Sequence, residues 1–345
     1  MSQIPIENVY YLLCYAWGQM REGEIAETGA SKQTELVDLF AKVLINGTER
    51  VLKQGLDRGY VTQSEDTSRP RGRIDFDTSL KRALLPRARV HCQYDTLSRD
   101  VLHNRILKST LGDLAQVESI DEDLRRKLLT LQRRFGEVSD VPLRRSLFRR
   151  VQLHSNNAFY RFLLNICSLV ERNLDLTEEG EGRQFRDFLR DKATMSTVFE
   201  DFVLNFYDRE QEVYDVSSPY ISWDVEGKPP DRLPRMETDV VLTSSDRTIV
   251  IDTKFYENPL VSNWEQKRYR SEHLYQLFSY LQNAETKGRR WKDAKGILLY
   301  AATDTDLDEK AFEVRGHKMQ AHSIDLDQKW WKIHDDLLTL VNIST

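Results

Sequence analysis

The segment METDVVLTSSDRTIVIDTKFY, residues 236–256, decides the fold of the second half of this chain. Two largely apolar runs flank the short polar turn SSDR, and this pattern predicts a β-hairpin. Alternate side chains of a strand share a face, so Asp252 and Lys254 point to the same side of the sheet. If Ser245 pairs with Asp246 across the turn, Asp239 lies directly opposite Asp252. A slip of one residue would move Asp239 to the other face, so the predicted site depends on this register.

Asp239, Asp252 and Lys254 form a candidate catalytic group. Directly opposed residues bring their Cβ atoms to about 5 Å, and two carboxylates at that distance repel each other unless one is protonated or a cation lies between them. Mg²⁺ binds a few carboxylates together with water and phosphate oxygens, and a bound metal polarises a phosphate and lowers the pKa of water. The Lys254 ammonium can stabilise the negative charge that develops. The pattern therefore indicates a Mg²⁺-dependent phosphodiesterase with metal at Asp239 and Asp252, against the alternative of a structural ion pair in the strand.

Two helices offer further candidate site residues. In HLYQLFSYL (273–281), Gln276 and Tyr280 stand at positions i and i+4 on one face, where both can hydrogen-bond a phosphate or a catalytic side chain. Glu200, in VFEDFVLNFY (198–207), is a candidate additional metal ligand. The alternatives are an ordinary half-buried helix face for Gln276 and Tyr280, and an exposed helical glutamate for Glu200.

The basic segment KGRRWK (287–292) lies close in sequence to these residues. Arg289, Arg290 and Lys292 are candidate contacts to DNA phosphates, because cationic side chains provide most of the affinity for a nucleic-acid backbone. A solvated basic surface is the alternative.

The remaining pattern predicts a mixed α+β and α/β protein. Apolar residues at helical spacing predict helices over residues 6–20, 34–52, 100–114, 157–173, 192–209, 273–284 and 329–341. The segment 55–94 is strand-like and rich in turns, and further strands are predicted at 296–302 and 317–325. We predict two domains, a mixed N-terminal domain at 1–145 and a second domain at 146–345 with a central mixed sheet flanked by helices.

Composition narrows the class of protein. The 345 residues are 40% hydrophobic and 30% charged, with a net charge of −5. This charge argues against a protein that coats nucleic acid with its whole surface, but it allows a local basic groove. Three separated cysteines, no long apolar run and no signal-peptide pattern indicate a cytoplasmic protein without membrane contact. No glycine has the spacing of a nucleotide-binding phosphate loop, so we expect no nucleotide to bind this chain.

The order Asp239, a short hairpin, Asp252-x-Lys254 and a helix with Gln276-x₃-Tyr280 resembles the PD-(D/E)xK nuclease superfamily, particularly its branch with a glutamine–tyrosine motif. Thr238 stands where the motif has proline.

The whole chain also resembles the McrC family, the nuclease subunits of McrBC modification-dependent restriction systems. The matching segments run from end to end: IPIENVYYLLCYAWG (4–18), RGRIDF (71–76), DTLSRDVLHNRILKSTL (95–111), LPRMETDVVL (233–242), IVIDTKFY (249–256) and LYQLFSYL (274–281).

This resemblance implies a restriction-endonuclease-like second domain that cuts double-stranded DNA carrying modified cytosine, with Mg²⁺, as a type IV restriction endonuclease subunit. It implies that the front domain docks onto a hexameric, McrB-like AAA+ GTPase and stimulates its GTP hydrolysis. The resemblance carries catalytic roles onto Asp239, Asp252 and Lys254, whereas Gln276 and Tyr280 match only the wider superfamily and Glu200 has no family counterpart. Two other functions remain open, an autonomous repair nuclease of the same superfamily and a non-catalytic activator of an AAA+ partner.

Overall fold

The computed structural model describes residues 4–18, 36–153, 158–176, 183–185, 189, 191–228, 230–255, 260–263, 266–302, 307 and 311–341. The chain forms two compact units. One unit combines Met1–Thr34 with Asp187–Thr345, and the other is Glu35–Arg186. This division differs from the predicted boundary near residue 145, because the chain enters the second unit after its first helix and returns from it about forty residues later than we predicted.

The first helix explains the difference. Helix α1 (Ile6–Ala16) packs against α8 (Lys192–Glu210), a helix that is remote in sequence. The Tyr15 hydroxyl donates a hydrogen bond of 2.8 Å to Glu210, and the ring of Tyr11 stacks on Trp330 at a centroid distance of 4.4 Å. The Asn8 amide donates to the backbone carbonyl of Leu326 at 2.9 Å. These contacts bury the apolar side of α1 and fix the N-terminus to the C-terminal half.

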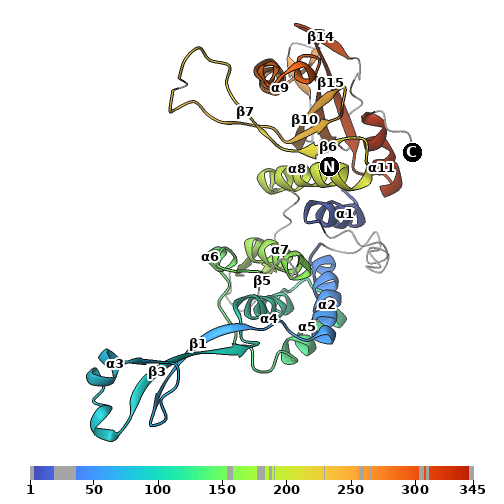
Figure 1. Ribbon diagram of the computed structural model, residues 1–345. Helices are drawn as coiled ribbons and strands as arrows, with labels where there is room; N and C mark the ends of the chain where they lie inside the picture. The colour runs from blue at the N-terminus through green and yellow to red at the C-terminus, as the bar shows by residue number, and fades with distance from the viewer. Residues whose placement is uncertain are drawn as a thin grey trace. The chain divides into compact units, whose positions relative to one another are not determined.

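A six-stranded mixed sheet forms the centre of this first unit (Figure 1), in the order β14-β15-β13-β10-β9-β6. Strands β10, β13 and β15 are parallel neighbours, and the other pairs are antiparallel. The strands are β6 (Asp215–Ser217), β9 (Val240–Thr243), β10 (Thr248–Phe255), β13 (Lys295–Ala302), β14 (Phe312–Val314) and β15 (His317–Asp325). A two-stranded ribbon of β7 (Tyr220–Ile221) and β8 (Met236–Glu237) and a second one of β11 (Leu260–Asn263) and β12 (Gln266–Tyr269) accompany it. The predicted mixed sheet flanked by helices is confirmed.

Helices cover both faces of the sheet. Helix α9 (Ser271–Ala284) packs on the face that carries Val250 and Leu298, and α8 packs against β10, β9 and β6. Gly296 permits the close approach of α9, since a Cβ atom at this position would lie 2.8 Å from Leu281 Cδ1 and 3.0 Å from Leu277 Cδ2. The short helix α10 (Arg289–Lys292) leads into β13, and α11 (Trp330–Leu340) closes the unit, with Leu337 O accepting a hydrogen bond from the Tyr207 hydroxyl at 2.7 Å.

The second unit, Glu35–Arg186, is mainly helical. Its helices are α2 (Leu36–Gln54), α4 (Leu102–Ala115), α5 (Glu122–Arg133), α6 (Arg145–Phe148) and α7 (Ala158–Asn173), with a short ribbon of β4 (Leu174–Leu176) and β5 (Arg183–Phe185). A three-stranded antiparallel sheet, β1 (Gly59–Thr67), β3 (Val90–Ser98) and β2 (Arg73–Asp75), extends from the helices and carries the short helix α3 (Phe76–Lys81) (Figure 1).

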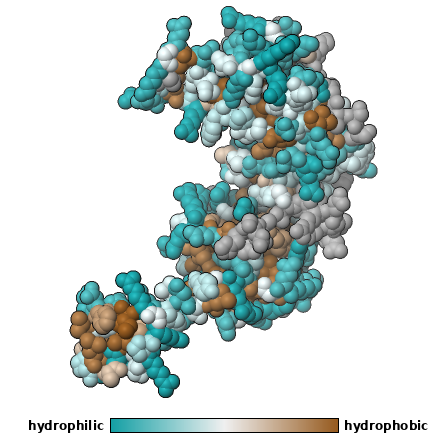
Figure 2. Space-filling view, viewed as in Figure 1, coloured by the Kyte–Doolittle hydropathy of each residue, from teal (hydrophilic) through white to brown (hydrophobic). Residues whose placement is uncertain are grey.

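Large apolar side chains are exposed on this extended sheet. Tyr60 is 79% exposed, Leu80 63% and Phe76 61%, and Leu97 and Leu85 are also exposed. Figure 2 shows hydrophobic residues gathered over the end formed by β1, α3 and β3. No helix among the described residues is long and apolar enough to cross a bilayer.

Candidate active site

The register of the hairpin agrees with the prediction. Strands β9 and β10 pair Thr243 with Thr248 and Val240 with Ile251, where the ladder ends. Asp239 is the first residue beyond this ladder, and its carboxylate lies close enough to Asp252 to affect the pKa of that residue. Asp252 and Lys254 lie on the α9 face of β10, the face that also carries Val250. The local alternation therefore brings Asp239, Asp252 and Lys254 together, as the sequence predicts.

Asp252 is fully buried, and its surroundings disfavour a negative charge. Burial, with a smaller contribution from the Asp239 carboxylate, raises the pKa of Asp252 to about 7 against the lowering effect of the Lys254 ammonium. Lys254 Nζ lies 2.7 Å from Asp252 Oδ2 in a largely buried ion pair. Oδ1 of Asp252 is buried and has no hydrogen-bond partner among the described residues. A buried carboxylate oxygen without a donor indicates a cation or a proton as its partner.

Asp239 is held by the strand that follows the turn. Its Oδ2 accepts one hydrogen bond from the backbone N–H of Thr253 at 2.7 Å and another from the Thr253 hydroxyl at 2.8 Å. Thr238, where the superfamily motif has proline, is buried and donates from its hydroxyl to Pro219 O at 2.7 Å. This hydrogen bond ties the chain before β9 to the segment beside β7, so Thr238 fixes the backbone although it lacks the ring of proline. Alternation along β10 predicts the Thr253 side chain on the face opposite Asp252, so no signal in the sequence pointed to this contact with Asp239.

Helix α9 contributes the predicted pair to the same face. Gln276 Nε2 donates to the Tyr280 hydroxyl at 2.7 Å. Burial raises the pKa of Tyr280 to about 12, and Asp252, Asp239 and Glu200 raise it too, so the hydroxyl lies within electrostatic reach of all three carboxylates. Tyr280 is buried in the cluster of Val250 and Leu298, which fixes its ring beside the site.

His273, one turn before Gln276, is a neighbour that the sequence analysis left without a role. Its Nδ1 lies 2.9 Å from the Tyr300 hydroxyl, and burial followed by the Lys254 charge lowers its pKa to about 4. The imidazole is therefore neutral near pH 7. No signal in the sequence distinguishes this histidine from a core residue, because its proximity to Lys254 arises from packing of α9 on β10.

Glu200 of α8 is electrostatically coupled to the site. Burial raises the pKa of Glu200 to about 7, and Asp239 adds to this increase more strongly than Asp252 does. Within the part of the chain that the structure describes, however, no three His, Cys, Asp or Glu side chains are arranged to hold a metal ion. Asp239 and Asp252 are thus the two carboxylates that the hairpin itself places together, and metal ligation by Glu200 stays a prediction.

The predicted DNA contacts of α10 lie at the other end of the sheet. Strand β13 is parallel to β10 and pairs Lys295 with Ile249, so α10 precedes the end at which β10 begins. Arg290 Nη1 donates to the carbonyl of Ser244 in the β9–β10 turn at 3.2 Å. The structure therefore does not bring Arg289, Arg290 and Lys292 beside Asp252, and a DNA contact there stays a prediction.

The site residues fit a hard divalent cation. Two carboxylates with a buried oxygen that lacks a donor supply the ligand type that Mg²⁺ prefers, and Mg²⁺ completes its coordination with water and substrate oxygens. The neighbouring ammonium and the Gln276–Tyr280 pair supply donors for anionic substrate oxygens.

Comparisons with known proteins identify the family of this chain. The type IV methyl-directed restriction enzyme EcoKMcrBC of Escherichia coli (strain K12) is 29% identical over 341 residues, which cover 98% of this chain and 97% of that protein. Thermococcus gammatolerans McrC, solved bound to McrB AAA+ hexamers, matches 98% of this chain and 75% of its own at 19% identity, with a TM-score of 0.58, and so shares the fold. A family model described as McrBC 5-methylcytosine restriction system component matches residues 7–301. The chain therefore belongs to the McrBC family of 5-methylcytosine restriction system components.

Proposed function

We propose that this chain is the DNA-cleaving subunit of a modification-dependent restriction complex and hydrolyses phosphodiester bonds with Mg²⁺. The observation that carries the proposal is the buried Asp252 carboxylate, which faces Asp239, pairs with Lys254 and has one oxygen without a donor. A core normally excludes such a group, and a structural ion pair would satisfy both oxygens. The likeness to EcoKMcrBC over nearly the full length of both chains supports a restriction role.

Each side chain has a defined part in hydrolysis. Asp239 and Asp252 would hold Mg²⁺, which supplies Lewis-acid activation of the phosphate and a water of lowered pKa when it is bound. The Thr253 hydrogen bonds fix the Asp239 carboxylate at the position opposite β10. Lys254 donates to the attacking water or to a non-bridging phosphate oxygen as negative charge grows. Tyr280, oriented by Gln276, donates to the substrate or to a carboxylate beside it.

The second unit suits a docking role. Its extended sheet exposes Tyr60, Phe76, Leu80 and Leu97 together, although large apolar side chains at a solvent-facing end cost free energy unless a partner covers them. T. gammatolerans McrC is bound to McrB AAA+ hexamers in its solved assembly. We infer that this chain docks onto a corresponding AAA+ GTPase through this sheet and stimulates its GTP hydrolysis, and that the partner selects DNA with modified cytosine.

A cleavage assay tests the proposal. Cytosine-methylated plasmid is incubated with Mg²⁺ and either this chain alone, the chain with its AAA+ partner and GTP, or Asp252→Asn with the same partner and GTP. We expect cutting only by the wild-type pair. Cutting by the isolated chain would instead favour an autonomous nuclease, and undiminished cutting by Asp252→Asn would disprove the site.

A second measurement separates loss of the metal site from loss of the complex. Partner GTPase stimulation should persist in Asp252→Asn, since that residue belongs to the first unit and the exposed sheet belongs to the second. Mg²⁺ should raise the unfolding midpoint of the wild-type chain at pH 8 and leave that of Asp252→Asn unchanged, because a ligand stabilises only the state that binds it.

A further inference from the structure

A groove in the second unit is lined by four arginines. It has a cavity volume of about 830 Å³ and lies between α7 and the segment that contains α6, two elements that neighbour each other in Figure 1. Arg161 and Arg172 come from α7, and Arg145 and Arg149 come from the turn of α6 and the residue that follows it. Phe148 and short uncharged side chains complete the lining.

Among the described residues, the arginines of this groove have no counterions. No Asp or Glu lines it, and none of the four arginines forms an ion pair with another described residue. The surrounding unit is basic as well, since Glu35–Arg186 holds 27 Lys and Arg residues against 22 Asp and Glu residues, a net charge of +5 in a chain of net charge −5. Clustered cations that repel one another without compensation reduce stability, so their gathering indicates an anionic partner.

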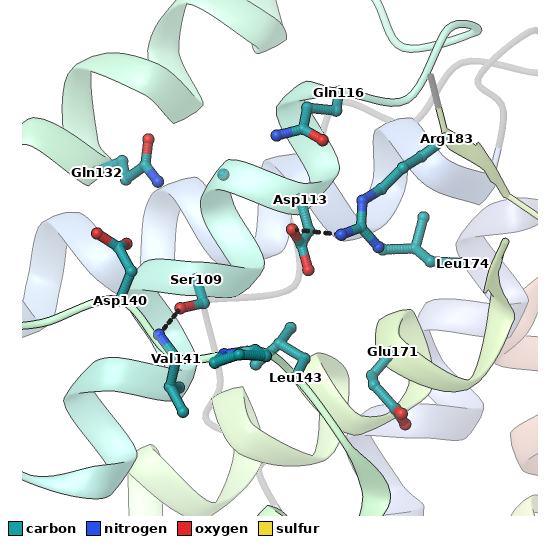
Figure 3. A pocket seen from close by; sticks show the side chains of 12 residues that line it. Ser109, Asp113, Gln116, Gln132, Asp140, Val141, Leu143, Glu171, Leu174 and Arg183 are labelled. Carbon is teal, nitrogen blue, oxygen red and sulfur yellow. Dashed lines mark hydrogen bonds and ion pairs between the residues drawn. The ribbon is translucent and has the colours of Figure 1, made fainter. Parts of the chain in front are cut away.

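A neighbouring cavity of the same unit shows the contrast (Figure 3). This cavity, of about 550 Å³, is lined by the acidic residues Asp113, Asp140 and Glu171, and Arg183 is the one cationic residue in the described part of its lining. There Arg183 Nη2 pairs with Asp113 at 3.0 Å, and burial raises the pKa of Asp113. Arg105 of the same unit is likewise compensated, by a contact of 2.7 Å with Asp100. The uncompensated arginine groove therefore differs in its charge balance from this neighbouring cavity.

The spacing of the arginines suits a row of phosphates. Arg161 and Arg172 stand eleven residues apart, three helical turns, so both project from one face of α7 about 16 Å apart along its axis. One strand of duplex DNA presents a phosphate every ~3.4 Å of helix axis, so this length matches about five nucleotides. The guanidinium fork binds phosphate oxygens in a bidentate way, which a lysine cannot do.

We propose that this arginine groove binds the phosphodiester backbone of duplex DNA and holds it on the second unit. The choice of DNA among polyanions rests on the proposed function. The duplex is favoured because Phe148 is the one aromatic side chain among the described residues that line the groove, whereas single-strand binding relies on rows of stacking aromatics. Backbone contacts of this kind carry no sequence information and would add affinity whatever the modified base.

Duplex binding by the full chain, measured by fluorescence anisotropy in EDTA over a series of salt concentrations, tests this proposal without any cleavage. The test variant replaces Arg145, Arg149, Arg161 and Arg172 by Gln. The matched control replaces three cationic residues of α5 and the residue that follows the helix, all outside the groove, by Gln, and so removes the same charge: Arg126, Lys127, Arg133 and Arg134. We expect the groove variant to lose at least about tenfold in affinity and the slope of log K against log salt to become shallower by about 3 to 4, near 0.9 per lost phosphate contact.

The control variant should keep its affinity within about threefold and its slope within about one, because its residues make no backbone contact. Equal losses of affinity in both variants would mean that net charge alone drives binding, and would refute the proposal that the groove binds DNA. Absence of salt-dependent duplex binding by the wild-type chain would overturn it as well. Unchanged DNA binding with lost association to the AAA+ partner would assign the groove to an acidic protein surface instead. Since Asp252→Asn should still bind DNA in this assay, failure of the groove and failure of the proposed cleavage site are distinguishable.

Discussion

The substitution Asp252→Asn should stabilise the metal-free chain in a manner that depends on pH. Burial raises the pKa of Asp252 from its ordinary 3.8 to about 7, so the folded state binds this proton more tightly than the unfolded state. The folded state is then penalised increasingly as pH rises from 3.8 through 7, and the penalty is constant above that range. At 1.36 kcal/mol per pKa unit, the full penalty is about 4 kcal/mol at pH 8 and about 2 kcal/mol at pH 5.

Asparagine has the shape of the protonated acid and cannot ionise, so the free energy of unfolding of Asp252→Asn should exceed that of the wild type by these amounts. All six tryptophans lie in the first unit, which makes the intrinsic fluorescence a reporter of that unit alone during urea unfolding. The experiment compares wild type and variant at pH 5 and pH 8 without divalent cations. We expect the stability gain of Asp252→Asn over the wild type to double from pH 5 to pH 8.

Asp246→Asn supplies the control, because Asp246 lies in the turn of the same hairpin and the Ser244 hydroxyl lowers its pKa. That carboxyl is ionised in both states throughout pH 5 to 8, so its substitution should leave the pH dependence of stability unchanged. Equal stability of Asp252→Asn and wild type at pH 8 would refute the reasoning, since it would show that the buried charge is already compensated without a metal.

Three further substitutions test how the site is held. Thr253→Val removes the hydroxyl donor to Asp239 and keeps the backbone donor, and it should cost about 1 kcal/mol in urea unfolding and reduce cleavage while duplex binding persists. Gly296→Ala places a methyl group against the leucines of α9, and we expect a loss of about 1–3 kcal/mol together with slower cleavage, checked by unfolding and single-turnover assays. Tyr280→Phe removes the acceptor of the Gln276 amide, and cleavage should fall at least about tenfold with little change in the unfolding midpoint, whereas full activity would exclude this pair from the mechanism.

The sequence alone determined the local geometry of the candidate site. Register in a hairpin follows from the turn and from side-chain alternation, which are encoded within about twenty consecutive residues, so the position of Asp239 opposite Asp252 was predictable. Helical periodicity likewise located α8 and α9 to within a few residues. Partners within one hairpin or one helix turn are constrained by short chain segments, which is why Gln276 and Tyr280 were also found together.

Only the tertiary structure decided which distant segments meet. Helix α1 joins the C-terminal half through Tyr15 and Glu210, and no local pattern encodes a contact across that separation. The parallel crossover returns the chain to the starting end of the sheet, so α10 is carried away from Lys254 although it is near in sequence. The arginine groove arises in the same way, because α6 and α7 each show only scattered arginines until packing sets them side by side. Periodicity specifies which face of an element is buried, but the complementary shapes and charges of two remote faces select their partner, and these exist only in the folded chain.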